Sequence, residues 1–160
     1  MVPGGFDLGH GVVREILDRR ILVCPTVNHH ARAATGRLPW PVRREQLRVM
    51  LAAGVEIVPG SDAGIPHTSH RMYPRPLDFY TDLGLTPADV VGLATRRAAE
   101  ALHCGHVTGT LTAGRSADLI AVHGDPIQDL HTLTTPILVM AAGHLRHLHA
   151  TPHAEEDIHP

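Results

Sequence analysis

The hydrophobic pattern alternates between helical and strand spacing over the first sixty positions. Four apolar residues at helical spacing predict an amphipathic helix over 12–20. The run 21–27 is apolar on both faces except for one proline, which is typical of a buried parallel strand. A second helix is predicted to start at Pro41 and to end at Gly54, directly before a strand over 55–58. This alternation predicts an α/β architecture of βα units.

The second half of the chain continues with helices and then with short strands. The segment 76–83 predicts a short helix, and Thr86 is the expected N-cap of a longer one. Pro87 occupies the first turn of that helix and Asp89 lies three residues after the cap, which is the capping-box pattern.

One acidic residue stands at the end of the predicted strand 55–58. The sequence from Gly60 onward reads Gly-Ser-Asp-Ala-Gly, so Asp62 follows a buried strand at its C-terminal tip. Parallel α/β folds place their catalytic groups at this end of the sheet. An ordinary Asp-Ala-Gly turn would show the same letters, and this stretch alone favours neither interpretation.

Histidines gather in the two long segments that follow the predicted strands. His29 and His30 follow the first strand, and His67 and His70 follow the second with His-x-x-His spacing. Loops of this length after barrel strands commonly line active sites, so His67 and His70 are candidate substrate-binding residues. Solvated loop histidines are the alternative, and two imidazoles alone make a weak metal site.

Composition narrows the range of partners. The chain has 160 residues, is 43% hydrophobic and carries a formal charge of −2, which favours neither nucleic acid nor an anionic membrane as a partner. We therefore expect a small-molecule or protein partner. All basic residues are Arg, so no mechanism can use a lysine of this chain. Cys24 and Cys104 form no disulfide framework, and no stretch spans a bilayer, which predicts a cytoplasmic protein.

Three segments together resemble the metal-dependent amidohydrolase superfamily, in its imidazolonepropionase-like and prolidase-like branch. They are the strand with Gly-Ser-Asp62-Ala-Gly, the helix over 94–102, and the motif Gly-Thr-Leu-Thr-Ala-Gly-Arg-Ser-Ala-Asp-Leu over 109–119, which is the most specific. In the helix, Arg97 stands where the family has Asn and His103 where it has Gly. These departures concern caps and packing rather than chemistry.

The resemblance implies a fold and a site. The fold would be α/β: the C-terminal portion of a (β/α)8 barrel, comprising its last two βα units over 1–107, then β-strands of the small composite β domain over 108–148 and a polar tail over 149–160. Asp62 would be the catalytic residue and a metal ligand, handling the proton of the attacking water. Asp118 would be structural, and zinc is the metal that the resemblance favours.

The resemblance also implies missing ligands. The family's His-x-His on the first strand, its bridging Lys or Glu and its single histidines on the fifth and sixth strands have no counterpart here. The stretch 136–143 continues the family pattern, and the resemblance implies that it ends in a hairpin. The motif His147-Leu-His149 follows this hairpin, and we interpret it as coincidental. The chain is thus expected to be the C-terminal part of an enzyme that hydrolyses an amide, cyclic amide or dipeptide through metal-activated water, inactive and holding no metal by itself.

Two alternatives to this function remain open. The chain could be a non-enzymatic remnant or interaction module, or a half-enzyme that works only with a separate chain supplying the N-terminal barrel portion. We also expect self-association or marginal stability of the isolated chain, because Leu22, Val55 and Ile57 would form an apolar inner face in water beside unpaired strand edges.

Overall fold

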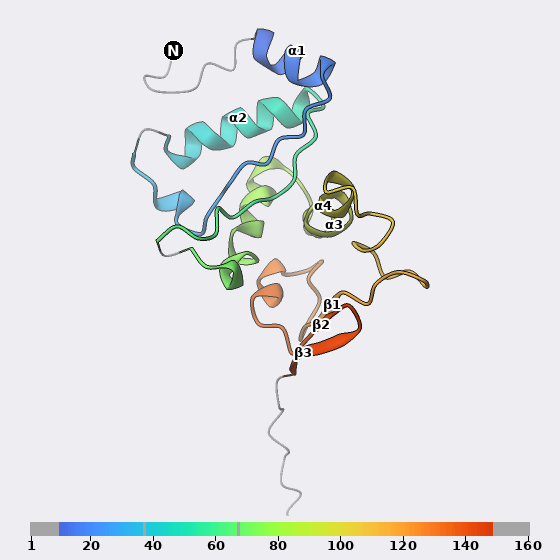
Figure 1. Ribbon diagram of the computed structural model, residues 1–160. Coiled ribbons are helices and arrows are strands. Elements are labelled where there is room, and N and C mark those ends of the chain that lie inside the picture. The colour runs from blue at the N-terminus through green and yellow to red at the C-terminus, as the bar shows by residue number, and fades with distance from the viewer. Residues whose placement is uncertain (1–9, 37, 67, 149–160) are drawn as a thin grey trace, which may run out of the picture.

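The computed structural model describes residues 10–36, 38–66 and 68–148 (Figure 1). Helix α1 (His10–Asp18) leads into a first extended segment, and α2 (Trp40–Ala52) leads into a second one. Three 3₁₀ helices follow these two segments: η1 (Ala31–Ala33) after the first, and η2 (His70–Met72) and η3 (Arg75–Leu83) after the second. The helices predicted over 12–20, from Pro41 and over 76–83 are therefore confirmed, the last as a 3₁₀ helix.

The two extended segments run parallel to each other. Val23 is bridged to Ile57, and Thr26 to Gly60. The Val23 N–H donates to the Glu56 carbonyl at 2.9 Å, and the Val58 N–H donates to the Val23 carbonyl at 3.1 Å. The two segments predicted as parallel strands, 21–27 and 55–58, are thus neighbours that pair through isolated parallel bridges rather than through a continuous ladder. Because α2 connects the two segments, they form one βα unit.

The two extended segments differ in burial. In the first, only Val27 is buried whereas Ile21 and Leu22 are exposed, so the prediction of a strand covered on both faces is wrong for 21–27. Val55 and Ile57 are only 4% and 3% exposed, whereas Leu22 is 36% exposed. The expectation that all three residues face water is therefore wrong for Val55 and Ile57, although the three do line one common cleft. Side chains alternate along a strand, so Leu22 points away from its neighbour Val23, which is paired with the buried Ile57. In the second segment Glu56 is the exposed residue, whereas Val55, Ile57 and Val58 are buried.

One continuous helix runs from Pro87 to Ala101. It comprises α3 (Pro87–Gly92), the π-helical turn η4 (Leu93–Arg97) and α4 (Ala98–Ala101). Thr86 forms the predicted capping box: its hydroxyl accepts a hydrogen bond from the Asp89 N–H at 3.2 Å, and the Asp89 carboxylate accepts one from the Thr86 N–H at 2.9 Å. The cap fixes where this helix begins.

A three-stranded antiparallel sheet follows the helices. Its order is β1 (Leu119–Ala121), β2 (Leu138–Ala141) and β3 (His144–Leu148), with η5 (Leu130–Thr134) between the first two strands. Ala142 and Gly143 both have positive φ and form the tight turn of the predicted hairpin. Asp118 accepts a hydrogen bond from the Ala142 N–H at 2.7 Å, a structural contact that also holds the pKa of its carboxyl below the ordinary value.

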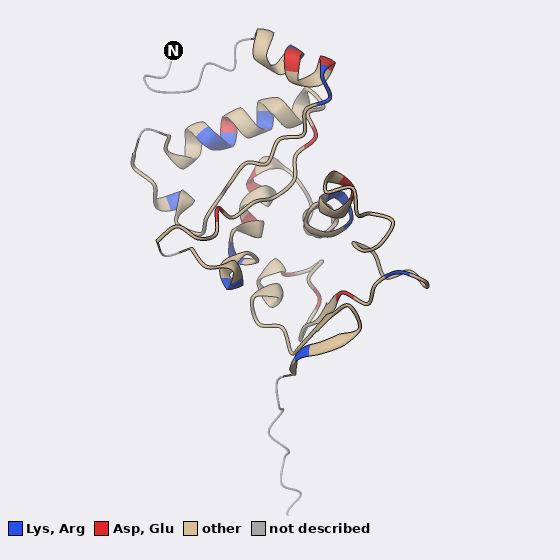
Figure 2. Cartoon of the chain, in the orientation of Figure 1, with Lys and Arg blue, Asp and Glu red and all other residues tan. Residues whose placement is uncertain are grey.

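The principal core joins the βα unit to the later elements. It consists of six buried side chains, contributed by α2, η3, α3 and η5: Leu47, Leu77, Tyr80, Leu83, Val90 and Leu130. The helix η5 therefore packs on the helical layer, although it lies between two strands of the small sheet. Charged positions of both signs are mixed along α2 and along the helix from α3 to α4 (Figure 2). None of the helices in the described part of the chain has the length and apolarity to cross a membrane.

Candidate functional site

Asp62 lies just beyond the end of the second extended segment, where the sequence places it. Its backbone has a φ of 57°, in the left-handed region, and its side chain is exposed. Asp and Asn enter this region more readily than other residues with a Cβ atom. The chain therefore turns sharply after Gly60 and presents the carboxylate to solvent at the tip of the parallel pair.

Gly60 is where the second extended segment last pairs with the first before Asp62. A Cβ atom added at Gly60 would lie 2.6 Å from the Cys24 sulfur, which is closer than packed atoms come. The Val27 N–H bonds to the Gly60 carbonyl at 2.9 Å. This backbone hydrogen bond ties the second segment to the first, two residues before Asp62, and so helps to determine where Asp62 is presented.

The segment after Asp62 forms a tight local loop. The Gly64 N–H donates to the Thr68 carbonyl at 3.0 Å, and the Thr68 side chain is buried. His70 begins η2 and is exposed, whereas His67 lies outside the described residues. Nothing in the described loop brings His70 into a cluster with Asp62 and other ligand types. Substrate binding by His67 and His70 stays a prediction.

His29 and His30 lie at the same end of the parallel pair as Asp62. They follow the first segment, as Asp62 follows the second, and parallel strands end at one edge. Their ring centroids are 3.9 Å apart, and the His30 N–H donates to the Asn28 side chain at 3.0 Å. The loop is therefore held in a local turn at the end of the parallel pair where Asp62 also lies, with His30 exposed and His29 partly buried.

A polar network anchors this loop to η3, and sequence reasoning missed it. Arg32 bonds Asp82 through Nε at 3.2 Å and Nη2 at 3.0 Å, and it bonds Asp78 at 2.6 Å. The Trp40 indole N–H donates to the same Asp82 at 2.9 Å, and the guanidinium lies 3.9 Å from the Phe79 ring centroid. The partners are 42 to 50 positions apart in sequence, so no local pattern could have indicated them.

The network shifts the ionisation of its members. Burial disfavours the charged form of Asp82, but the hydrogen bonds from Arg32 and Trp40 outweigh burial and hold the pKa of this carboxyl below its ordinary value. Burial likewise opposes the charged guanidinium, and the hydrogen bonds to Asp82 and Asp78 still raise the pKa of Arg32. Both groups therefore stay ionised at neutral pH, as a structural clamp requires.

Asp82→Asn is expected to lower the melting temperature at neutral pH, by an amount that shrinks in acid. A carboxyl with a depressed folded pKa contributes stability above its unfolded pKa of about 3.9. That contribution is lost as the pH falls through the folded pKa, so the two proteins should converge. Thermal melts of both proteins from neutral to acidic pH measure the difference.

Asp18→Asn is the matched control for this pH series. Asp18 forms an exposed ion pair with Arg14 at 3.8 Å on α1, and exposed pairs contribute little to stability. Its substitution should leave the melting temperature nearly unchanged throughout. An Asp82→Asn deficit that stays constant down to strong acid would contradict the assignment of the network's contribution to ionised Asp82.

Three other chemically capable side chains near the parallel pair are kept neutral. Burial, with a smaller contribution from Cys24, raises the pKa of Tyr73 to about 12, and burial also raises the pKa of Tyr80. The Tyr80 hydroxyl donates to the Pro25 carbonyl at 3.2 Å, which is a structural contact. Burial raises the pKa of the Cys24 thiol, so it is not a thiolate nucleophile at neutral pH.

The ligand set expected of a metal centre is incomplete here. Within residues 10–36, 38–66 and 68–148, no three His, Cys, Asp or Glu side chains are placed to share a metal ion. His147 lies on β3, in the small sheet rather than in the βα unit, and His149 lies outside the described residues. Asp62 suits a metal as one exposed carboxylate, but the described residues do not make a complete site around it.

Comparison with solved structures gives several close matches in fold. A Xaa-Pro dipeptidase with bound methionine superposes with a TM-score of 0.74 at 21% identity, covering 87% of this chain and 37% of that one. A putative prolidase from Bifidobacterium longum is 33% identical, with a TM-score of 0.62, over 66% of this chain and 26% of that one. An adenosine deaminase from Xanthomonas campestris with bound zinc has a TM-score of 0.61 at 18% identity, covering 89% and 36%.

These matches bear on the expected barrel. The chain spans only about a quarter to two fifths of the length of these solved relatives. Their fold places the present α/β unit in a TIM-barrel-type architecture, which the sequence predicted in its coarse form. No protein with a curated function matches the chain.

The sequence itself matches one protein family over most of its length. The match to the Amidohydrolase family extends from residue 15 to residue 146, which includes the parallel pair, Asp62, the capped helix and the small sheet. The resemblance drawn from the three sequence segments is therefore confirmed: this chain belongs to the amidohydrolase family.

Proposed function

We propose that this chain contributes Asp62 to an enzyme that hydrolyses the C–N bond of an amide, a cyclic amide or a dipeptide. The observation that carries the proposal is the position of Asp62 within the family match: an exposed carboxylate in the left-handed conformation, directly after a strand of the parallel pair. Hydrolysis of C–N bonds is supported by the family and by the prolidase-like structural relatives.

The chemistry assigned to Asp62 is proton transfer. Its carboxylate accepts a proton from the attacking water and returns it to the leaving nitrogen, which would otherwise depart as a poor anionic leaving group. Positioned acid–base groups of this kind contribute about 10²- to 10⁴-fold to a rate. The hydrogen bond between the Val27 N–H and the Gly60 carbonyl supports this role because a catalytic carboxylate must be held at a defined place.

A divalent metal, for which we favour zinc, would supply the polarisation that makes water nucleophilic at neutral pH. Family members typically use a divalent metal, and the deaminase relative holds zinc. The further ligands of such a centre would have to come from outside the described residues. We place the protein in the cytoplasm and expect a small-molecule substrate, which His67 and His70 would contact.

The substrate proposal rests on the prolidase-like relatives. One is a Xaa-Pro dipeptidase with methionine in its active site, and another is a putative prolidase from Bifidobacterium longum. A small amide or dipeptide is therefore the substrate class to test first. Among the described residues, one loop with His30 follows the first extended segment, and one loop with His70 follows the second segment and Asp62. We expect the contacts that determine substrate specificity in these two loops.

The isolated chain is expected to hold no stoichiometric metal and to hydrolyse no dipeptide. One carboxylate without fixed imidazole partners cannot define a tetrahedral or binuclear centre. The test is to incubate the chain with zinc, dialyse it into zinc-free buffer and measure the metal that remains. A dipeptide hydrolysis assay is run on the same sample. The Asp62→Asn chain is the control and should retain the same trace of zinc. Retention of about two equivalents together with hydrolysis would contradict the expectation.

A non-enzymatic interaction module is the second candidate. It is favoured by the lack of a three-ligand cluster among the described residues. The two candidates differ in one measurable respect: an enzyme assembled with further barrel units gains activity that depends on Asp62, whereas an interaction module binds its partner and stays inactive.

A further inference from the structure

The loops that follow the two extended segments contain no acidic residue. Their sequences, 28–39 and 63–75, hold four histidines and four arginines but neither Asp nor Glu. Over the whole chain the acidic residues outnumber the arginines, by sixteen to fourteen, so this absence is a local property. The candidate catalytic carboxylate of Asp62 is therefore followed by a stretch of chain that offers only cationic and neutral side chains.

The second of these loops is fixed next to Asp62. The Gly64 N–H donates to the Thr68 carbonyl at 3.0 Å, and the Thr68 N–H donates to the Ile65 carbonyl at 3.1 Å, so the chain turns back on itself two residues after Asp62. Thr68 is also buried, which anchors the turn. The segment 69–75 therefore starts from a fixed point close to the candidate catalytic residue.

Arg71 and Arg75 are neighbours on the surface of this segment. The backbone is helical across the junction of η2 and η3: Tyr73 has φ −50° and ψ −40°, and Pro74 has φ −68° and ψ −24°. Residues three or four positions apart in such a backbone lie next to each other, and two like charges at this spacing destabilise it. Both arginines are exposed. Their pairing is therefore unfavourable for the fold unless an anion lies beside them.

The acidic residues that follow this pair bond another group. Asp78 is the acidic residue nearest in sequence to Arg75, but its carboxylate accepts a hydrogen bond from Arg32 at 2.6 Å. Asp82 likewise bonds Arg32, at 3.0 Å. Within the part of the chain that the structure describes, neither Arg71 nor Arg75 has an ion pair or a side-chain hydrogen bond. Both guanidinium groups therefore keep their N–H donors for a ligand.

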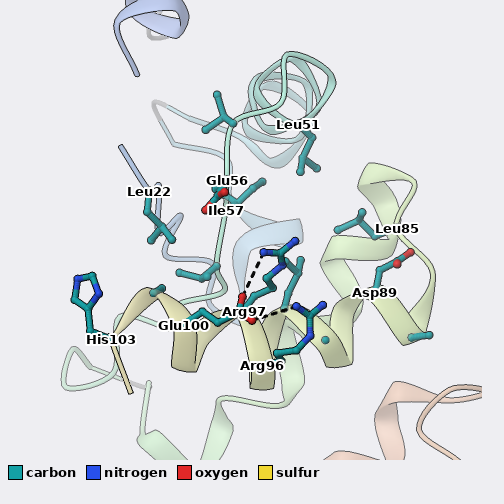
Figure 3. A pocket seen from close by; sticks show the side chains of 16 residues that line it. Leu22, Leu51, Glu56, Ile57, Leu85, Asp89, Arg96, Arg97, Glu100 and His103 are labelled. Carbon is teal, nitrogen blue, oxygen red and sulfur yellow. Dashed lines mark hydrogen bonds and ion pairs between the residues drawn. The ribbon is translucent and has the colours of Figure 1, made fainter. Parts of the chain in front are cut away.

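Several helical arginines elsewhere have an acidic partner three or four positions away. Arg96 and Arg97 both bond Glu100, at 3.2 Å and 3.3 Å, as the dashed lines in Figure 3 mark. Arg48 on α2 bonds Glu45 at 3.3 Å. At the same spacing, the segment 69–75 has a second arginine instead of an acid. This difference favours a role in binding over a role in stability.

We propose that Arg71 and Arg75 form a carboxylate subsite, which binds a carboxylate group of the substrate. A guanidinium group presents paired N–H donors that match the two oxygens of a carboxylate. The proposal rests on the proposed function for the bond that is cleaved. It narrows the substrate from any small amide to an amide or dipeptide that carries a free carboxylate.

Titration of the full 160-residue chain tests the carboxylate subsite without turnover. One probe is N-acetylproline, which has a carboxylate, and the other is N-acetylprolinamide, in which a neutral amide replaces it. Nuclear magnetic resonance of the ¹⁵N-labelled chain follows the backbone amides of 69–75. We expect N-acetylproline to shift them saturably, with an affinity that falls as salt is added. N-acetylprolinamide should bind at least about fivefold more weakly.

Two double variants locate the binding. Arg71→Gln with Arg75→Gln should weaken the binding of N-acetylproline by about fivefold or more. Arg44→Gln with Arg48→Gln is the matched control, because these arginines are also exposed and four positions apart, on α2. Both double variants remove two positive charges, so they differ only in position. Since all four side chains are exposed, both variants should keep the melting temperature of the original chain, which a thermal melt checks.

Three results of the titration would overturn the proposal. The first is that N-acetylproline causes no saturable shift in 69–75. The second is that N-acetylproline and N-acetylprolinamide bind equally well, because the carboxylate would then contribute nothing. The third is that the two double variants weaken binding equally, because the anion would then respond only to the total charge of the chain.

The assembled enzyme separates the carboxylate subsite from the proposed function. In it, Arg71→Gln with Arg75→Gln should lower kcat/KM for a dipeptide by about fivefold or more and leave kcat/KM for the corresponding dipeptide amide nearly unchanged. Turnover that depends on Asp62 but does not distinguish the two substrates would overturn the subsite and leave the proposed function standing. Binding of N-acetylproline at 69–75 without any turnover dependent on Asp62 would support the subsite and overturn the proposed function.

Discussion

Asp62→Asn is expected to reduce turnover of the assembled enzyme by about 10²- to 10⁴-fold while leaving the fold intact. The amide keeps the shape of the carboxylate but cannot accept a proton or ligate a metal as an anion. Asn also tolerates the left-handed backbone at this position, where φ is 57°, so the tip should keep its conformation. Steady-state kinetics on an amide or dipeptide, with a thermal melt of each protein, measure both effects.

His147→Ala and His149→Ala provide the control for that experiment. His147 lies on β3 of the small sheet, and His149 lies outside the described residues. The double variant should keep nearly full turnover, because the motif His-x-His there is interpreted as coincidental. If the double variant lost activity and Asp62→Asn kept it, the site would have been assigned to the wrong part of the chain.

Gly109→Ala is expected to destabilise the chain by about 2–5 kcal/mol. Gly109 has a φ of 89°, a region that costs a residue with a Cβ atom roughly 1–2 kcal/mol. The added Cβ would also lie 2.5 Å from the Ala99 Cβ and 3.2 Å from the Thr95 carbonyl oxygen. Both neighbours belong to the rigid helix 87–101, so relief of the overlap costs about 1–3 kcal/mol more. Urea unfolding followed by circular dichroism measures the loss.

Gly114→Ala separates the two contributions. Gly114 has a similar φ of 86°, but a Cβ atom there meets nothing within 4 Å. This variant should therefore lose only the conformational part, roughly 1–2 kcal/mol. Equal losses at the two positions would mean that the contact between Gly109 and the helix contributes nothing, and that the capped helix and the following turn are not closely packed in solution.

Local signals predicted most of the elements. The capping pattern of Thr86, Pro87 and Asp89 is satisfied within four residues, so the start of that helix could be predicted without knowledge of the rest of the chain. Gly60 and Asp62 likewise follow directly from a strand that ends in a turn. In each case the physical cause is short-range: backbone conformation, capping and side-chain periodicity act over one or two turns of chain.

Long-range contacts could not be predicted in this way. Arg32 bonds Asp78 and Asp82 only because η3 folds back on the loop after the first extended segment, and neither acidic residue is distinguishable by its local sequence. The exposure of the residues in the parallel pair was predicted incorrectly for the same reason. The sequence shows which residues are apolar, but it does not show which of them other elements cover. Ile57, which pairs with Val23, is buried, whereas the equally apolar Leu22 is exposed.

The sequence by itself therefore determined the family, the order of the helices and strands, and Asp62 as the candidate catalytic group. The tertiary structure alone decided that Val55 and Ile57 are buried, that Leu22 is exposed, and that Arg32 bonds Asp82. The division has one physical reason. Motifs and caps are local properties of the chain, whereas burial and open edges depend on which distant segments pack together.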